Sequence, residues 1–215
     1  MEERMKYTIL FLFLLVFSTH AQDSFSAIQF NVGLGSPSVP TDFSDYWNSS
    51  INFGAGYSHY FNSSISIQGN VEYDLFTLDD ETLLTDAGLN YQGYTLDGGN
   101  VSSLFMSADF QFNIISVTHR FSPYILAGIG FIHTSIADAT LSDGYSSADF
   151  PGGSENAFGF DLGAGLQLNV AANFSIYGEV RYIRGLTKKV WTDTGWSDDD
   201  KTAYVPIKLG GMFWF

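Results

Sequence analysis

The chain has 215 residues, no Cys, and 9 Lys plus Arg against 23 Asp plus Glu, which gives a formal net charge of −14. This acidity argues against a nucleic-acid partner, because phosphate binding needs a basic surface. The lack of Cys excludes disulfides, thiolate metal sites, a Cys nucleophile and a lipid-modified N-terminal Cys.

The start of the chain has the organisation of a secretory signal peptide. A positive charge precedes an unbroken apolar run over residues 9–17, and small residues follow at the cleavage positions. The run is too short for a membrane-spanning helix, which needs about 20 apolar residues. We therefore expect a cleaved signal peptide at residues 1–21 and one domain over residues 22–215. The sequence leaves open whether Met1 or Met5 is the initiator.

Eight later segments alternate between apolar and polar residues, a pattern typical of β-strands with two different faces. In chain order they cover residues 24–34, 51–61, 65–76, 101–115, 123–136, 156–170, 174–186 and 204–215. Their connections are alternately long and short, which is the layout of an outer-membrane barrel. The sequence thus predicts an all-β fold, an eight-stranded antiparallel up-and-down transmembrane β-barrel. In it the last strand closes against the first.

The polar faces of these segments decide between two kinds of barrel. A soluble, lipocalin-like barrel would turn its apolar face inward. Here the polar face has many glycines and charges of both signs, which suits a narrow lumen that side chains just fill. We assign to the lumen a polar network of Glu72, Asp74, Asp109, Asp161, Glu179, Arg181 and Lys208. We expect these charges to pair and fill the lumen; the alternative is the lining or gate of a narrow, low-conductance channel.

Residues 123–131 read Pro-Tyr-Ile-Leu-Ala-Gly-Ile-Gly-Phe, and the chain ends on Phe215 after apolar residues at alternate positions. In these features the chain resembles the family of small outer-membrane β-barrel domains that includes the OmpA transmembrane domain, OmpX and OmpW. The resemblance implies a monomer in a bacterial outer membrane, in contact with membrane lipid and lipopolysaccharide. It also implies that the barrel-assembly machinery reads a C-terminal signal in Leu209, Phe213 and Phe215, although Gly211 interrupts the series.

The four long connections hold 15 of the 23 carboxylates. They form either a solvated, repulsive surface or sites for divalent cations, which prefer carboxylate oxygens. Asp198, Asp199 and Asp200 lack the spacing of an EF-hand loop. Aromatic residues in the same connections, among them Trp47 and Tyr46, either form a contact surface or cover the rim of the barrel.

His133 and Ser135 share a strand face near a long loop, and Glu155 or Asp138 could orient the imidazole as in a lipid-modifying hydrolase or acyltransferase. No further motif supports that alternative. We expect a non-enzymatic outer-membrane protein, without a cofactor, that acts structurally or through interactions of its acidic outer loops.

Overall fold

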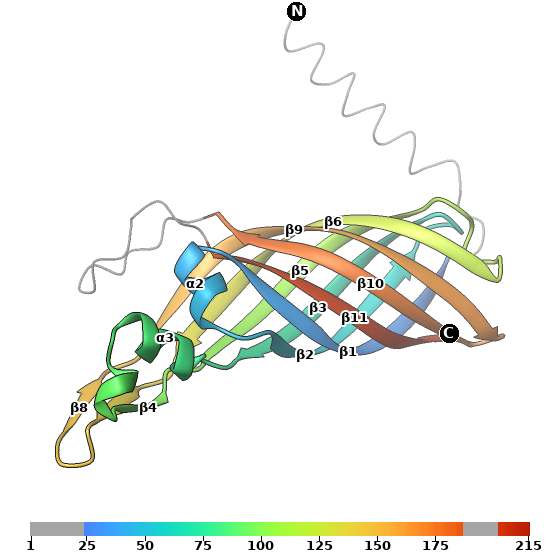
Figure 1. The fold of residues 1–215 in the computed structure, drawn as a ribbon. Coiled ribbons are helices and arrows are strands. Elements are labelled where there is room, and N and C mark those ends of the chain that lie inside the picture. The colour runs from blue at the N-terminus through green and yellow to red at the C-terminus, as the bar shows by residue number, and fades with distance from the viewer. Residues whose placement is uncertain (1–23, 187–201) are drawn as a thin grey trace, which may run out of the picture.

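The computed structural model describes residues 24–186 and 202–215. Eight antiparallel strands form a closed barrel in the order β1-β11-β10-β9-β6-β5-β3-β2 (Figure 1). Their bounds are β1 Phe25–Val39, β2 Ser50–Tyr60, β3 Ile65–Phe76, β5 Val101–Asn113, β6 Phe121–Ile136, β9 Gly153–Ala171, β10 Phe174–Gly185 and β11 Ala203–Trp214. The predicted fold class is confirmed, and most strand ends lie within three residues of their predicted positions.

The barrel closes where the sequence predicts, between its first and last strands. Ala27 lies opposite Trp214, and the register continues to Leu34 opposite Ile207. The backbones of Ser26 and Phe215 exchange two hydrogen bonds, of 3.0 and 2.9 Å. The last strand therefore has no free edge along this pairing.

One predicted boundary is wrong by five residues. The Gly-, Ser- and Pro-containing stretch after Leu34 is not a loop but the end of β1, which runs on to Val39. It extends because Gly35, Ser36 and Pro37 continue the pairing with β11. Strand pairing, which no local composition reveals, overrides the turn-like sequence here.

The long connections contain further elements that the sequence did not predict. The first holds helix α2, Thr41–Tyr46, and the second holds helix α3, Asp80–Asp86, and a 3-10 turn, Asn90–Gln92. Strands β4 (Thr95–Gly98), β7 (Ala139–Ser142) and β8 (Ser147–Phe150) form a separate sheet in the order β4-β7-β8. In Figure 1 these elements lie together beyond one end of the barrel. Within residues 24–186 and 202–215, no helix is long and apolar enough to cross a membrane.

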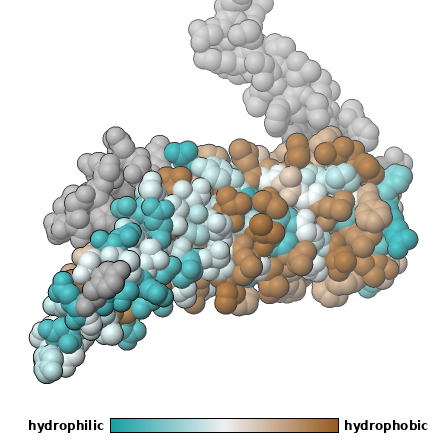
Figure 2. Space-filling model, in the orientation of Figure 1, coloured by the Kyte–Doolittle hydropathy of each residue, from teal (hydrophilic) through white to brown (hydrophobic). Residues whose placement is uncertain are grey.

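The two faces of the barrel wall differ in polarity, because successive side chains of a strand point to opposite faces. Large apolar side chains are exposed all along the outer face, for example Phe30 (55%), Ile129 (71%) and Leu209 (70%). Figure 2 shows apolar residues gathered over the visible face of the barrel, with hydrophilic residues over the loops. Polar side chains are buried inside. This is the inverse of a soluble barrel, and it excludes the lipocalin-like alternative.

Candidate functional site

The structure places the seven ionisable residues of the expected polar network inside the barrel. None of them is more than 5% exposed. They come from five strands, and each points inward because it shares the polar face of its strand. The members are Glu72 and Asp74 of β3, Asp109 of β5, Asp161 of β9, Glu179 and Arg181 of β10, and Lys208 of β11.

Arg181 lies at the centre of this network. Its Nη1 is 2.7 Å from Asp109 Oδ2 and 3.0 Å from Asp161 Oδ2, and its Nε donates to Glu179 Oε1 at 2.5 Å. Its Nη1 is also 3.8 Å from Glu72 Oε1. One guanidinium thus binds carboxylates from three other strands as well as its own, which its planar set of five donors allows.

Lys208 provides the second positive charge. It stands opposite Glu179 in the β10–β11 register, with 2.9 Å between Lys208 Nζ and Glu179 Oε1, and it also donates to Glu72. The Tyr124 hydroxyl donates to the other Glu179 oxygen at 2.8 Å. Glu179 is therefore bound by both cations and a phenol, the pattern that a buried charge requires.

Asp74 belongs to a separate polar group nearer the long loops. Its two oxygens accept from Ser50 Oγ at 2.7 Å and from Asn52 Nδ2 at 2.9 Å. No ion pair of Asp74 with Arg181 or Lys208 is found among the described residues. Six of the seven residues thus form one ionic network, and Asp74 is bound separately by neutral hydrogen-bond donors.

Room for the ionic network comes from a glycine. A Cβ on Gly128 would overlap the Oδ1 atoms of both Asp109 and Asp161. Gly128 lies opposite Asp109 in the β5–β6 register and opposite Asp161 in the β6–β9 register. The hydrogen in place of a side chain leaves space for both carboxylates to turn toward Arg181.

At the long-loop end the lumen is closed by an apolar cluster, the outer plug. Its buried members are Phe43, Phe76, Val101, Phe105, Ile132, Ile183 and Tyr204. Phe43 comes from α2 and packs edge-on against Phe76, with ring centroids 4.9 Å apart. The sequence showed this only weakly, in Ile132 and other apolar residues on the otherwise polar face of β6. The rest required knowing that α2 folds over the barrel mouth.

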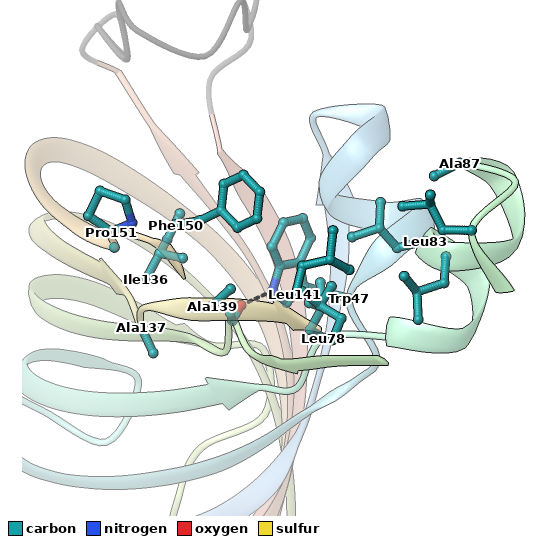
Figure 3. A pocket seen from close by; sticks show the side chains of 15 residues that line it. Trp47, Leu78, Leu83, Ala87, Ile136, Ala137, Ala139, Leu141, Phe150 and Pro151 are labelled. Atoms are coloured by element: carbon teal, nitrogen blue, oxygen red, sulfur yellow. Dashed lines mark hydrogen bonds between the residues drawn. The ribbon is translucent and has the colours of Figure 1, made fainter. Parts of the chain in front are cut away.

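Beyond the plug, three segments of the outer loops line an apolar pocket of about 350 Å³, which we call the outer pocket. Figure 3 shows Trp47 beside Leu78, with Leu83 on α3 and Ala139 and Leu141 on β7. The remaining lining is Leu84, Ala87, Leu89, Leu96, Gly99, Ile136, Ala137, Phe150, Pro151 and Gly152. The Trp47 indole donates to the Gly99 carbonyl at 3.0 Å, which joins the first two segments.

The sequence pointed to Trp47 as part of a contact surface or of the barrel rim, but it did not predict this pocket, because the apolar residues among the acids of the long loops were given no role. The detectable signal is a series of leucines, at positions 78, 83, 84, 89 and 96, within the most acidic loop. Asp79 caps α3 by accepting from the Thr82 amide at 3.1 Å, so the acidic residues here also shape the loop. In the β7–β8 turn, the amides of Ser146 and Tyr145 donate to Asp143 and lower the pKa of its carboxyl group.

The family comparison agrees with this geometry. The model of the outer membrane protein beta-barrel domain family matches residues 9–211. The chain belongs to this family. Outer membrane protein PagN of Salmonella typhimurium is 29% identical over 84 residues, which are 39% of this chain and 35% of PagN, so the match spans about a third of that relative.

Solved structures give the same fold. A major outer membrane protein from Thermus thermophilus superposes with a TM-score of 0.56 at 10% identity, covering 90% of this chain and 100% of that one. Neisserial surface protein A gives 0.50 at 12% identity, covering 88% and 96%. At these identities the likeness concerns the fold alone. This outer membrane barrel spans the bacterial outer membrane with its apolar band against lipid and its long loops on the outside.

In the outer membrane barrel, the candidate catalytic residues His133 and Asp138 each have a hydrogen-bond partner outside the candidate group. His133 Nδ1 lies 2.8 Å from the amide oxygen of Asn156, its neighbour on β9. Asp138 Oδ1 instead accepts from the Gly152 amide at 2.6 Å. An amide cannot stabilise an imidazolium as a carboxylate does.

The other expected sites have different outcomes. Among the described residues, no group of three or more His, Asp or Glu is placed to hold a metal ion, and Asp198, Asp199 and Asp200 lie outside those residues. Cation binding therefore stays a prediction. The expected assembly signal is exposed: Leu209 and Phe213 lie on the outer face of β11, and Phe215 follows the strand. The expected signal peptide also lies outside the described residues.

Proposed function

We propose that this outer membrane barrel is a non-enzymatic protein that acts through interactions of its outer loops. The proposal is supported by the location of the surface that is available for binding, which lies in the outer loops and not inside the barrel. Inside the barrel the charges pair with one another and the outer plug fills the mouth. The outer loops, in contrast, fold into helices and a small sheet around the open, apolar outer pocket.

The barrel interior supports a non-conducting role. Ion pairs cross the lumen at its centre, from Arg181 of β10 to Asp109 of β5 and from Lys208 of β11 to Glu72 of β3. Above them the plug is apolar, which opposes the passage of hydrated ions. In planar bilayers we expect no steady unitary openings; such openings would support the channel alternative instead.

The interaction role can be tested on cells that express the barrel. One variant replaces residues 80–98 and 139–150 with short Gly-Ser links and keeps α2 and all eight barrel strands. We expect wild-type cells to attach to other cells or to host-cell monolayers and the variant cells to lose that attachment. Heat-modifiable migration on cold SDS gels confirms that both barrels are folded. Equal attachment by the two would contradict the proposal.

The enzyme alternative has its own test. Because His133 contacts an amide, we expect His133→Ala to leave the lipid A profile unchanged by mass spectrometry in cells that express the barrel. Loss of a lipid A modification in this variant, with the barrel still folded, would require an enzymatic role.

We also propose that Leu209 and Phe213 of β11, together with Phe215 after the strand, form an assembly signal. Phe215 contributes backbone bonds to barrel closure, but its side chain is 69% exposed. Phe215→Ala keeps the backbone bonds and removes the ring. We expect a several-fold lower amount of this variant in the outer membrane, with unchanged unfolding of the refolded barrel. A normal amount in the membrane would exclude Phe215 from the signal.

A further inference from the structure

The outer pocket has the size and lining of a binding site but is surrounded by negative charge. Its volume of about 350 Å³ lies within the usual range for ligand pockets, which starts at roughly 300 Å³. The structure assigns it one class of occupant: we infer that it receives an apolar side chain from a basic peptide segment of a partner protein. This inference rests on the proposed interaction function and specifies the chemistry of the partner.

Charge around the pocket selects against anionic ligands. The three segments that form it, residues 41–48, 78–99 and 136–152, hold ten carboxylates and no Lys, Arg or His. Several carboxylates adjoin lining residues directly: Asp97 follows Leu96, and Asp149 precedes Phe150. A fatty acid or a lipid A phosphate would bring negative charge into this field. A ligand with positive charge next to its apolar group is attracted by it.

An unpaired sheet edge beside the pocket favours a peptide over a small amphiphile. β8 is the last strand of the β4-β7-β8 sheet, and among the described residues it pairs with β7 alone. All four of its residues are exposed, and Phe150 at its end lines the pocket. An extended peptide can add to such an edge through main-chain hydrogen bonds. Alternate side chains of that peptide then point toward the pocket while the others meet the carboxylates.

The binding experiment uses the full chain in nanodiscs of phosphatidylcholine, whose headgroup has no net charge. The probe is a fluorescent peptide of alternating Lys and apolar residues, Lys-Leu-Lys-Phe-Lys-Leu-Lys. Two matched peptides replace either the apolar residues by Ser or the lysines by Glu. We expect fluorescence anisotropy to show saturable binding of the first peptide, binding at least about tenfold weaker for each of the others, and none to empty nanodiscs.

Two matched variants place the binding at the pocket. Phe150→Gln removes an apolar wall, whereas Tyr145→Gln makes the same kind of change at a fully exposed turn of the same hairpin. We expect about tenfold weaker binding for Phe150→Gln and no change for Tyr145→Gln. Added salt should weaken the wild-type binding, because part of it is electrostatic.

Equal binding by both variants, or equal affinity for the Glu-containing peptide, would overturn the inference. Absence of peptide binding to the wild type would do so as well. The proposed function is judged separately by cell attachment. If attachment requires the loops but the peptide does not bind, the inference alone fails; if attachment does not require the loops, the proposed function fails.

Discussion

The lumen and the outer pocket use carboxylates in opposite ways. In the lumen four buried carboxylates share two cations, and the ion pairs found among the described residues lie there. Around the outer pocket ten carboxylates have no base in their own segments. In water unpaired carboxylates cost little, whereas inside a barrel each needs a partner. From this difference we expect the lumen charges to stabilise the barrel, and we propose that the loop charges interact with other molecules.

Removal of the central cation of the lumen should have the largest effect on stability. Arg181→Ala leaves four carboxylates without the guanidinium that binds them. Breaking a buried ion pair by removing one partner costs about 3–5 kcal/mol, and we expect a loss at the upper end of that range. Urea unfolding of the refolded barrel in lipid vesicles, followed by tryptophan fluorescence, measures it.

Arg184→Ala is the matched control, because it removes the same side chain from the outward face of the same strand. We expect it to change the free energy of unfolding by less than about 1 kcal/mol. Equal losses for the two arginines would mean that the lumen network does not stabilise the barrel.

Lys208→Ala should have the next largest effect. Lys208 binds Glu72 and Glu179, but Arg181 contacts both of these carboxylates as well and remains in the variant. We therefore expect a loss of about 3 kcal/mol, the lower end of the range for a broken buried pair. The same urea titration tests it. An unchanged midpoint would contradict the placement of the polar face in the lumen.

Gly128→Ala perturbs the ionic network of the lumen without removing a charge. The added methyl group would displace the carboxylates of Asp109 and Asp161 from Arg181. Overpacking of this kind costs about 1–3 kcal/mol. Gly69→Ala is the control, since a Cβ at Gly69 meets no atom within 4 Å. A similar stability for both variants would show that the network tolerates displacement of its acids.

The lumen could be predicted from sequence far better than the outer pocket, for a physical reason. Period-2 alternation is local, so the side of a strand on which Glu72 or Arg181 lies follows from its neighbours in the chain. Which acid meets Arg181 depends on register and barrel closure, and the distinct environment of Asp74 did not follow from the pattern. The outer plug required α2 to bring Phe43 over the barrel mouth.

The outer pocket depends on contacts between distant segments. Trp47, Leu83 and Leu141 meet only because α2, α3 and β7 fold together above the barrel. None of these elements has a strong local signal: α2 has six residues and β7 has four. Short elements of this kind are stabilised by tertiary contacts more than by their own sequence. The acidic composition of the loops was visible, but their leucines gained meaning only in three dimensions.

We expect the smallest effect on barrel stability from a change in the outer loops, because their charges and their small sheet do not support the barrel. Within the part of the chain that the structure describes, β7 pairs with β4 and β8 and with no barrel strand. Replacing residues 139–150 with a short Gly-Ser link removes the β7–β8 hairpin, including two of its carboxylates, and keeps α2 and the outer plug. We expect the urea midpoint of the barrel to stay unchanged while binding of the basic peptide is lost. A lower midpoint would show that the loop sheet stabilises the barrel, and the separation between a structural lumen and a displayed outer surface would then no longer hold.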